Sequence, residues 1–181
     1  PRKPPLWRAA PPAERCGQRA AQDLAAARRA VFLNHRLLAA DLLDLGIDVD
    51  CAPVVDLRLP GAHAVIGDRA FGGDPILVAD LGRAAMEGLL AGGVQPIVKH
   101  IAGHGRATVD SHHALPRCAT PLAELEASDF LAFRLLRDAP WAMTAHVVFE
   151  ALDPTQSATT SARVIEETIR GHIGFDGLLI S

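Results

Sequence analysis

The run Val94-Gln95-Pro96-Ile97-Val98, followed at once by Lys99-His100, decides the fold class of this chain. It is short, mostly apolar and ends in two polar side chains, which is typical of a buried strand that leads into a functional edge. Before it, Asp74-Pro75 predicts the start of a helix that ends near Gly92-Gly93. After it, Thr120-Pro121 predicts the start of another helix. A strand with a helix on each side along the chain predicts a parallel β/α unit.

The same alternation extends outward in both directions. Strands are predicted at 47–55, 94–98, 142–148 and 178–180, and helices at 13–45, 75–92, 120–136 and 161–171. Four strands separated by helices favour an α/β fold with parallel strands over a meander or a helical bundle. Two architectures fit. The length of 181 residues favours an open doubly wound sheet, because a (β/α)8 TIM-like barrel normally needs about 250 residues, but the positions of the polar residues favour a partial barrel.

The composition excludes several classes of protein. Hydrophobic residues make up 49% and charged residues 22% of the chain, which excludes intrinsic disorder. No apolar run approaches the ~20 residues of a membrane-spanning helix, so we expect no membrane partner. The net charge of −3 gives no positive field for a polyanion, so we expect no nucleic-acid partner. Cys16, Cys51 and Cys118 are odd in number and widely spaced, which predicts no disulfide framework and favours a reducing compartment.

Polar side chains gather where the predicted strands end. Asp56 follows the first strand, Lys99 and His100 follow the second, and His146 lies near the end of the third. Parallel β/α folds collect reactive groups at the carboxyl ends of their strands, so these residues predict a site on one rim. Two assignments stay open within it. Asp56 either contacts a ligand or caps a loop, and His146 either lines the rim or packs through a hydrogen bond.

The segment 100–120 is long for a connection between a strand and a helix, and four of the eight histidines lie in it. Gly103 and Gly105 flank His104, so the backbone there can take unusual dihedral angles or approach a ligand closely. The ending that a phosphate-binding loop requires, Gly-Lys-Ser/Thr, is missing.

Three interpretations of this segment remain open. The first is a metal site, with ligands drawn from His100, His104, Asp110, His112 and His113. The second is a structural loop with solvated histidines. The third is acid/base chemistry by His112, because a carboxylate such as Asp110, bonded to one ring nitrogen, fixes the tautomer and raises the basicity of the other nitrogen.

The run KHIAGHGRATVDSHHALP, residues 99–116, resembles the signature of glycoside hydrolase family 3. Within that family it is similar to the NagZ-type enzymes, which are bacterial β-N-acetylglucosaminidases (β-hexosaminidases) of peptidoglycan recycling. Supporting stretches follow in the expected order: APVVDLR at 52–58, IGDRAFG at 66–72, TAHVVFEALDP at 144–154 and IRGHIGFDGLLIS at 169–181. The resemblance covers essentially the whole chain after its first few residues.

This resemblance implies a barrel fold, a retaining mechanism through a covalent glycosyl-enzyme intermediate, and neither cofactor nor metal. Most retaining glycosidases use two carboxyl groups, whereas the resemblance assigns the acid/base role to a dyad of Asp110 and His112. A histidine suits that role because it titrates near neutral pH without a buried environment. By the same resemblance, Arg69, Lys99 and His100 bind hydroxyl groups of a non-reducing N-acetylglucosamine in a saccharide substrate.

Two of these cations have plainer alternatives. Arg69 could instead pair with Asp68 or Asp74 on the surface, and Lys99 could be a buried ion-pair partner. Lysine and arginine fit a sugar site because both donate several hydrogen bonds and accept none.

The chain departs from the family pattern at both ends. The family's nucleophile is an aspartate directly after the strand that here ends at Ser181, and its first strand would precede Pro1. Asp153 and Asp176 lie in the wrong contexts to replace that nucleophile. We therefore expect residues 1–181 to form a single incomplete catalytic domain of the family's N-terminal type.

Three functions follow as expectations. The first is that the full-length parent hydrolyses terminal β-linked N-acetylglucosamine from muropeptides or related glycosides in the bacterial cytoplasm, with transfer to phosphate left open. The second is a noncatalytic fragment with weak sugar binding. The third is a metal-dependent barrel hydrolase that uses His100, His104 and His112.

Overall fold

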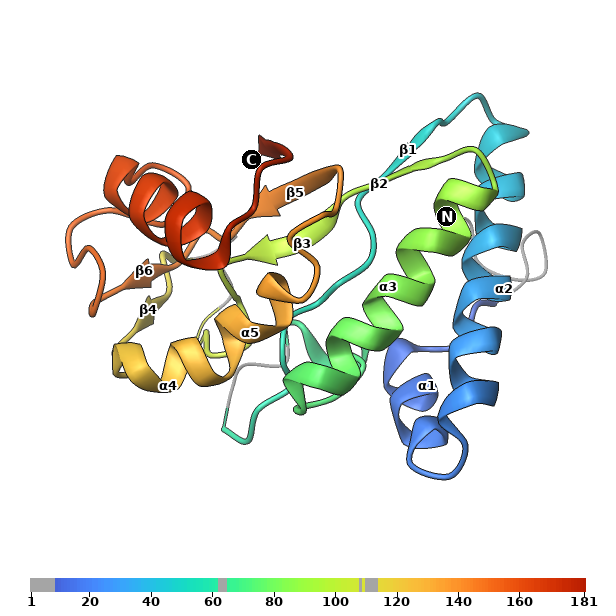
Figure 1. The fold of residues 1–181 in the computed structure, drawn as a ribbon, viewed down its shortest axis with the longest axis horizontal. Coiled ribbons are helices and arrows are strands. Elements are labelled where there is room, and N and C mark those ends of the chain that lie inside the picture. Colours follow the sequence, from blue (N-terminus) through green and yellow to red (C-terminus); the bar gives the residue numbers. More distant parts are fainter. Residues whose placement is uncertain (1–8, 62–64, 108, 110–113) are drawn as a thin grey trace.

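The computed structural model describes residues 9–61, 65–107, 109 and 114–181 of the chain. Helices and parallel strands alternate along the sequence, as the hydrophobic pattern predicts. At the centre, strand β3 (Val98–Ile101) pairs in parallel with β5 (Trp141–Thr144), and β5 pairs in parallel with β7 (Leu178–Ile180). Figure 1 shows β3 and β5 side by side between two groups of helices.

A second parallel pair continues this arrangement on the other side of β3. Strand β1 (Val49–Asp50) pairs with β2 (Gln95–Pro96), and a parallel bridge joins Val54 to Lys99. Neighbouring strands therefore follow the order of the chain, with a helix in each connection. A doubly wound sheet reverses its strand order at a switch point, whereas a barrel does not. The described strands thus form part of a TIM-like barrel, and the length argument for an open sheet is wrong.

Two long helices cover one side of the strands. Helix α2 (Leu24–Leu43) packs along α3 (Pro75–Ala91), with the short α1 (Ala13–Ala20) beside them (Figure 1). Asp74 caps α3 by accepting hydrogen bonds from two backbone N–H groups of its first turn.

The contact between α2 and α3 is close because small residues face each other. A Cβ atom on Gly88 would lie 2.4 Å from the carbonyl oxygen of Phe32, so only glycine allows this approach. The predicted start and end of α3 are confirmed.

The other group of helices follows β3 and β5. It consists of α4 (Leu122–Ala127), α5 (Asp129–Arg134) and the π-helical segment η2 (Val164–Ile173), drawn in red in Figure 1. The Ser161 hydroxyl accepts a hydrogen bond from the N–H of Val164 at 3.2 Å, which confirms Ser161 as the predicted cap. No helix in the described ranges is long and apolar enough to cross a membrane.

The structure corrects several predicted elements. The strand predicted at 47–55 is reduced to β1 and a bridge at Val54, and the helix predicted at 120–136 is divided into α4 and α5 at Ser128. The helix predicted at 13–45 is interrupted between α1 and α2, because Asp23 takes an extended conformation and accepts a hydrogen bond from Ala26 N–H. The strand predicted at 142–148 ends at Thr144, where its partner β3 also ends. Beyond this point, β6 (Val148–Phe149) pairs instead with β4 (Arg117–Cys118).

Buried aromatic side chains fill the space between the strands and this second group of helices. Phe130, Phe149 and Phe175 are each at most 1% exposed. The rings of Phe130 and Phe149 meet edge to face with centroids 6.1 Å apart, a favoured geometry for aromatic pairs. This core fixes α5 against the strands and so supports the loop that follows β3.

Candidate active site

Asp56 organises the backbone that follows the middle of β3. Its side chain is 0% exposed. Oδ1 accepts the backbone N–H of His100 at 3.2 Å and that of His104 at 2.7 Å, while Oδ2 lies 2.6 Å from Nδ1 of His100. Of the two roles that the sequence left open for Asp56, the structure shows the contacts of the loop-capping one.

The charge of Asp56 requires a hydrogen on Nδ1 of His100. Burial raises the pKa of a carboxyl group, but here His100 and the N–H of His104 outweigh burial and hold the pKa of Asp56 below its usual range. An ionised carboxylate only accepts hydrogen bonds, so Nδ1 of His100 carries a hydrogen. Nε2 is then the nitrogen that remains for a ligand. The strand predicted at 94–98 was ended too early, because Lys99 and His100 lie within β3.

His104 lies behind His100, and its ring is 5% exposed. The two ring centroids are 5.4 Å apart, and burial lowers the pKa of His104, so this imidazole is neutral at neutral pH. Its Nδ1 atom is buried and has no hydrogen-bond partner in the part of the chain that the structure describes.

The two glycines that flank His104 are there for the reasons that the sequence predicts. Gly103 has a φ of +136°, which L side chains rarely adopt. A Cβ atom on Gly105 would lie 2.0 Å from the carbonyl oxygen of Leu57, so this backbone segment lies directly against its neighbour.

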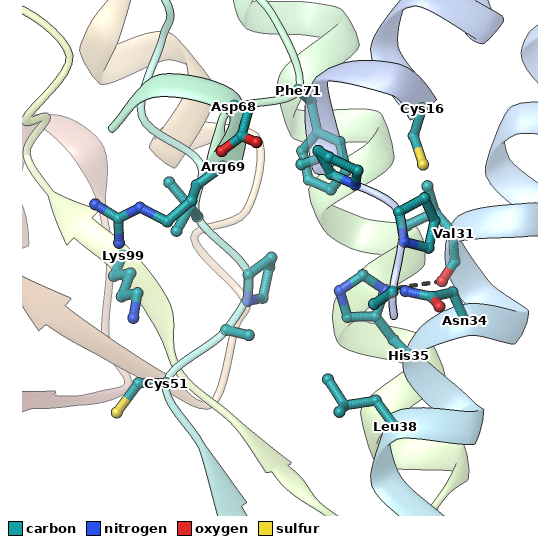
Figure 2. Close-up of a pocket in the computed structure, with 17 residues that line it drawn as sticks. Cys16, Val31, Asn34, His35, Leu38, Cys51, Asp68, Arg69, Phe71 and Lys99 are labelled. Atoms are coloured by element: carbon teal, nitrogen blue, oxygen red, sulfur yellow. Dashed lines mark hydrogen bonds between the residues drawn. The ribbon is translucent and has the colours of Figure 1, made fainter. Parts of the chain in front are cut away.

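Lys99 and Arg69 line one cavity of about 450 Å³. Lys99 comes from β3 and Arg69 from the short helix η1 (Gly67–Arg69). Figure 2 shows these two cations on one wall of the cavity, with His35 and Leu38 of α2 on the opposite wall. Binding pockets for small molecules usually measure about 300–1,000 Å³, so the cavity has room for one sugar ring.

Arg69 is not held by a surface ion pair. Its Nη2 donates to the carbonyl oxygen of Val65 at 2.6 Å, and the described residues include no ion pair between Arg69 and Asp68 or Asp74. Lys99 is half-buried. Burial of Asp50 raises the pKa of that carboxyl group, and the positive charge of Lys99 acts in the opposite direction.

The structure places His146 after β5. Its side chain is exposed, and Nδ1 lies 2.7 Å from Oγ1 of Thr159. Thr159 Oγ1 in turn lies 2.9 Å from Oγ1 of Thr144, the last residue of β5. His146 thus makes a hydrogen bond at the strand end while its side chain stays exposed, so the structure does not decide between lining the rim and packing through a hydrogen bond. Asp110, His112 and His113 lie outside the described residues, so the predicted acid/base dyad stays a prediction.

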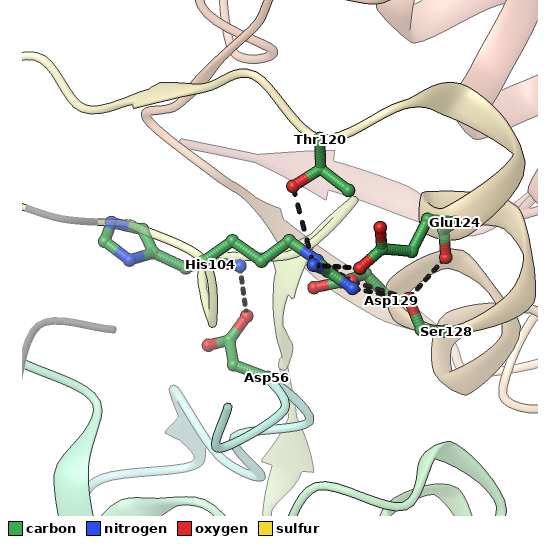
Figure 3. A network of polar contacts seen from close by, with 7 residues as sticks. Asp56, His104, Thr120, Glu124, Ser128 and Asp129 are labelled. Atoms are coloured by element: carbon green, nitrogen blue, oxygen red, sulfur yellow. Dashed lines mark hydrogen bonds and ion pairs between the residues drawn. The ribbon is translucent and has the colours of Figure 1, made fainter. Parts of the chain in front are cut away.

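Arg106 is the polar residue of this region that sequence reasoning missed. Its guanidinium is bonded to Asp129 at 2.6 Å, Glu124 at 2.7 Å and Ser128 at 2.9 Å. Figure 3 shows these side chains, together with Thr120, converging from the region of α4 and α5. The only local signal was a basic residue in a loop that is otherwise rich in glycine and histidine.

The metal alternative gains no support from the described residues. None of their His, Cys, Asp and Glu side chains form a group of three or more that could hold a metal ion. His100 already directs Nδ1 at Asp56, and the third proposed ligand, His112, lies outside the described ranges.

The family model for the N-terminal domain of glycosyl hydrolase family 3 matches residues 16–181. The chain belongs to glycoside hydrolase family 3. The strand order and the polar strand ends described above fit that membership, because the family resemblance implies a TIM-like barrel.

Named relatives agree with this assignment. The chain is 42% identical to a β-hexosaminidase of Alkalilimnicola ehrlichii over 147 residues, which cover 80% of this chain and 42% of that protein. It is 38% identical to a β-hexosaminidase of Bordetella avium over 88% of this chain and 46% of that protein. The chain thus spans less than half the length of these two curated relatives.

Solved structures give the same result. NagZ from Neisseria gonorrhoeae in complex with N-trifluoroacetyl-D-glucosamine superposes with a TM-score of 0.88 at 38% identity. This match covers 94% of the present chain and 51% of that one. A family 3 β-N-acetylglucosaminidase from Paenibacillus superposes with a TM-score of 0.82 at 37% identity, over 92% of this chain and 31% of that one.

Proposed function

We propose that the protein is a retaining glycoside hydrolase that releases terminal, non-reducing β-linked N-acetylglucosamine from muropeptides or related glycosides. The observation that carries this proposal is the meeting of Lys99 and Arg69 in one cavity, with the next residue of β3, His100, bonded to a buried carboxylate. Membership of family 3 and the names of the relatives support the reaction class and the sugar.

In this proposal, the sugar is held by hydrogen bonds between its hydroxyl groups and three side chains. Lys99 and Arg69 donate hydrogen bonds to hydroxyl oxygens, since neither side chain accepts any. His100, whose Nδ1 is bonded to Asp56, has Nε2 left for a hydrogen bond with a hydroxyl group. The three side chains together fix the ring and its orientation, while Asp56 and His104 stay behind them.

The proton transfers are assigned to Asp110 and His112. As the aspartate expected directly after Ser181 attacks the anomeric carbon, protonated His112 gives its hydrogen to the departing glycosidic oxygen. In the second half, neutral His112 takes a proton from water while that water attacks the same carbon and releases the aspartate. An imidazole supports both halves near neutral pH, and Asp110 holds the ring.

The cell context belongs to the same proposal. We place the full-length protein in peptidoglycan recycling in the bacterial cytoplasm, with saccharides that contain N-acetylglucosamine as substrates. The three cysteines, which are all free, fit a reducing compartment.

A leaving-group series tests the acid/base assignment. The protein would be expressed from its complete reading frame and assayed on aryl N-acetyl-β-glucosaminides whose phenols span a wide pKa range. His112→Ala should lower kcat by about 10²–10⁴-fold on poor leaving groups and far less on good ones, which need little acid help. Asp110→Asn should show the same pattern more weakly.

The control is His146→Ala, because His146 is an exposed histidine after β5 whose Nδ1 lies 2.7 Å from Oγ1 of Thr159. It should change kcat by the same small factor for every phenol. Wild-type rates of His112→Ala on the poorest leaving groups would exclude His112 as the acid.

A further inference from the structure

Five residues join the two ends of the segment 107–119. We call them the Arg106 clamp: Arg106, Thr120, Glu124, Ser128 and Asp129. Arg106 belongs to the loop after β3, and its partners belong to the start of α4 and α5 (Figure 3). Side chains that are 14 to 23 positions apart therefore hold the chain where it enters the segment and where it leaves it.

The clamp uses the geometry of a guanidinium. Nε bonds to Asp129 at 2.6 Å, Nη1 to Glu124 at 2.7 Å, and Nη2 to Ser128 at 2.9 Å, so all three nitrogens are engaged. A planar fork that is bonded at each nitrogen has little freedom to turn, and lysine cannot reproduce it. Asp129 is 2% exposed, whereas Glu124 is 57% exposed, so the bond to Asp129 is the least screened by water.

The backbone just before Arg106 is fixed on two sides. A Cβ atom on Gly103 would lie 3.0 Å from Cβ of Asp129, and one on Gly105 would lie 2.0 Å from the carbonyl oxygen of Leu57. The loop thus rests against both α5 and the backbone after β1 before it reaches Arg106. Asp129 takes part in both contacts, because it packs on Gly103 and binds the guanidinium.

We infer that Arg106 is a positioning residue for the acid/base dyad. This inference rests on the proposed function, which assigns the dyad to Asp110 and His112. A chain of four residues spans at most about 14 Å, so the place where Arg106 is held limits where a side chain four positions on can act. Displacing a catalytic group by about 1 Å can lower the rate about 100-fold. The clamp acts on proton transfer through the dyad and does not touch the sugar.

A purely structural role would give a different result. If Arg106 only stabilised the fold, its loss would lower the active fraction and reduce all rates equally. The chain offers a matched control in Arg83 of α3, which makes two bonds to Asp138, at 2.7 and 3.0 Å, and one to the carbonyl oxygen of Leu135 at the end of α5. Arg83→Ala removes an arginine–carboxylate pair of the same type without touching the loop after β3.

The experiment compares three variants of the protein expressed from its complete reading frame, on aryl N-acetyl-β-glucosaminides with poor and good leaving groups. Arg106→Ala should lower kcat about 30–100-fold on the poor leaving group but at most about threefold on the good one, with KM within about twofold. Arg106→Lys should restore part of the loss. Arg83→Ala should change both rates by one common factor. Should Arg106→Ala not fold, Arg106→Lys and Glu124→Gln carry the same comparison.

His112→Ala, measured in parallel, separates the two claims. Strong leaving-group dependence in His112→Ala, with equal losses on both substrates in Arg106→Ala, would overturn the clamp and leave the proposed function standing. No leaving-group dependence in His112→Ala would overturn the proposed function and the clamp with it. Selective loss in both variants, absent from Arg83→Ala, is the result that the clamp predicts.

Discussion

Oδ2 of Asp56 lies 2.6 Å from Nδ1 of His100 and thereby joins a fully buried carboxylate to a side chain that is 18% exposed. The same carboxylate also holds the backbone N–H groups of His100 and His104. One buried charge thus fixes both the shape of the loop after β3 and the tautomer of the histidine that we assign to sugar binding. Its consequences can be measured in solution.

Asp56→Asn should destabilise the protein by about 1–3 kcal/mol at pH 7, because a charged acceptor of three hydrogen bonds is lost. The pKa of Asp56 is lower in the folded protein than in the unfolded chain, so its stabilising effect is present above pH ~4 and is lost as the pH falls through the folded value. The difference between wild type and variant should therefore shrink on acidification. Urea unfolding from pH 7 down to about pH 2 measures it, with the decrease expected only below about pH 4. A difference that stays constant down to about pH 2, or one as small at pH 7 as that of the exposed Asp176→Asn, would contradict the account.

Gly105→Ala should destabilise the protein by about 3 kcal/mol or prevent folding. The added Cβ would lie 2.0 Å from the Leu57 carbonyl oxygen, which is backbone and cannot move aside cheaply. Gly72 is the control, because a Cβ there meets nothing within 4 Å and its φ is not positive. Thermal unfolding of both variants decides the matter. Equal midpoints for Gly105→Ala and Gly72→Ala would mean that the loop does not lie against the backbone of Leu57.

How far the fold follows from the sequence depends on how local each signal is. The helix starts at Asp74-Pro75 and Ser161 could be predicted because capping acts within one turn. The break at Asp23 was missed although helix capping by an aspartate is also local. The surrounding alanines and leucines favour helix on both sides of it. The pairing of β4 with β6 was missed because nothing in two residues identifies a partner 31 positions away.

The site divides in the same way. Lys99, His100 and Arg69 could be selected from their position at strand ends and from the family motif, and the structure brings Lys99 and Arg69 to one cavity. The burial of Asp56 could not be foreseen, since a carboxylate at a strand end looks the same whether it faces solvent or a backbone loop. Arg106 was missed because its partners come from α4 and α5, and sequence alone does not place those helices against the loop.

Lys99→Met should raise KM for aryl N-acetylglucosaminides about 10–100-fold, because a charge-assisted hydrogen bond to a hydroxyl contributes roughly 1.5–3 kcal/mol. Arg69→Met should act in the same direction. Arg28→Met removes an arginine of α2 that pairs with Asp80 of α3 at 3.0 Å, and it should leave KM unchanged. Steady-state kinetics on the protein from its complete reading frame measures all three. Unchanged KM in both Lys99→Met and Arg69→Met would remove these cations from the sugar site.

Asp153→Ala should lower Tm while kcat stays within a few-fold of wild type. The Asp153 carboxylate accepts hydrogen bonds from Ser161 Oγ at 2.6 Å and from Thr155 N–H at 2.9 Å, which holds the turn before η2 and keeps the pKa of Asp153 well below its usual range. Differential scanning calorimetry and a rate measurement on the same sample give both numbers. A fall in kcat of several thousand-fold at an unchanged Tm would instead make Asp153 the nucleophile.

A crystal structure of the protein with N-acetylglucosamine bound tests most directly whether β3 and η1 together form a sugar site. We expect one pyranose ring in the cavity, with hydroxyl oxygens within about 3.2 Å of Lys99 Nζ, an Arg69 guanidinium nitrogen and His100 Nε2. Clear density for the sugar at another place, with all three side chains free of it, would contradict that claim.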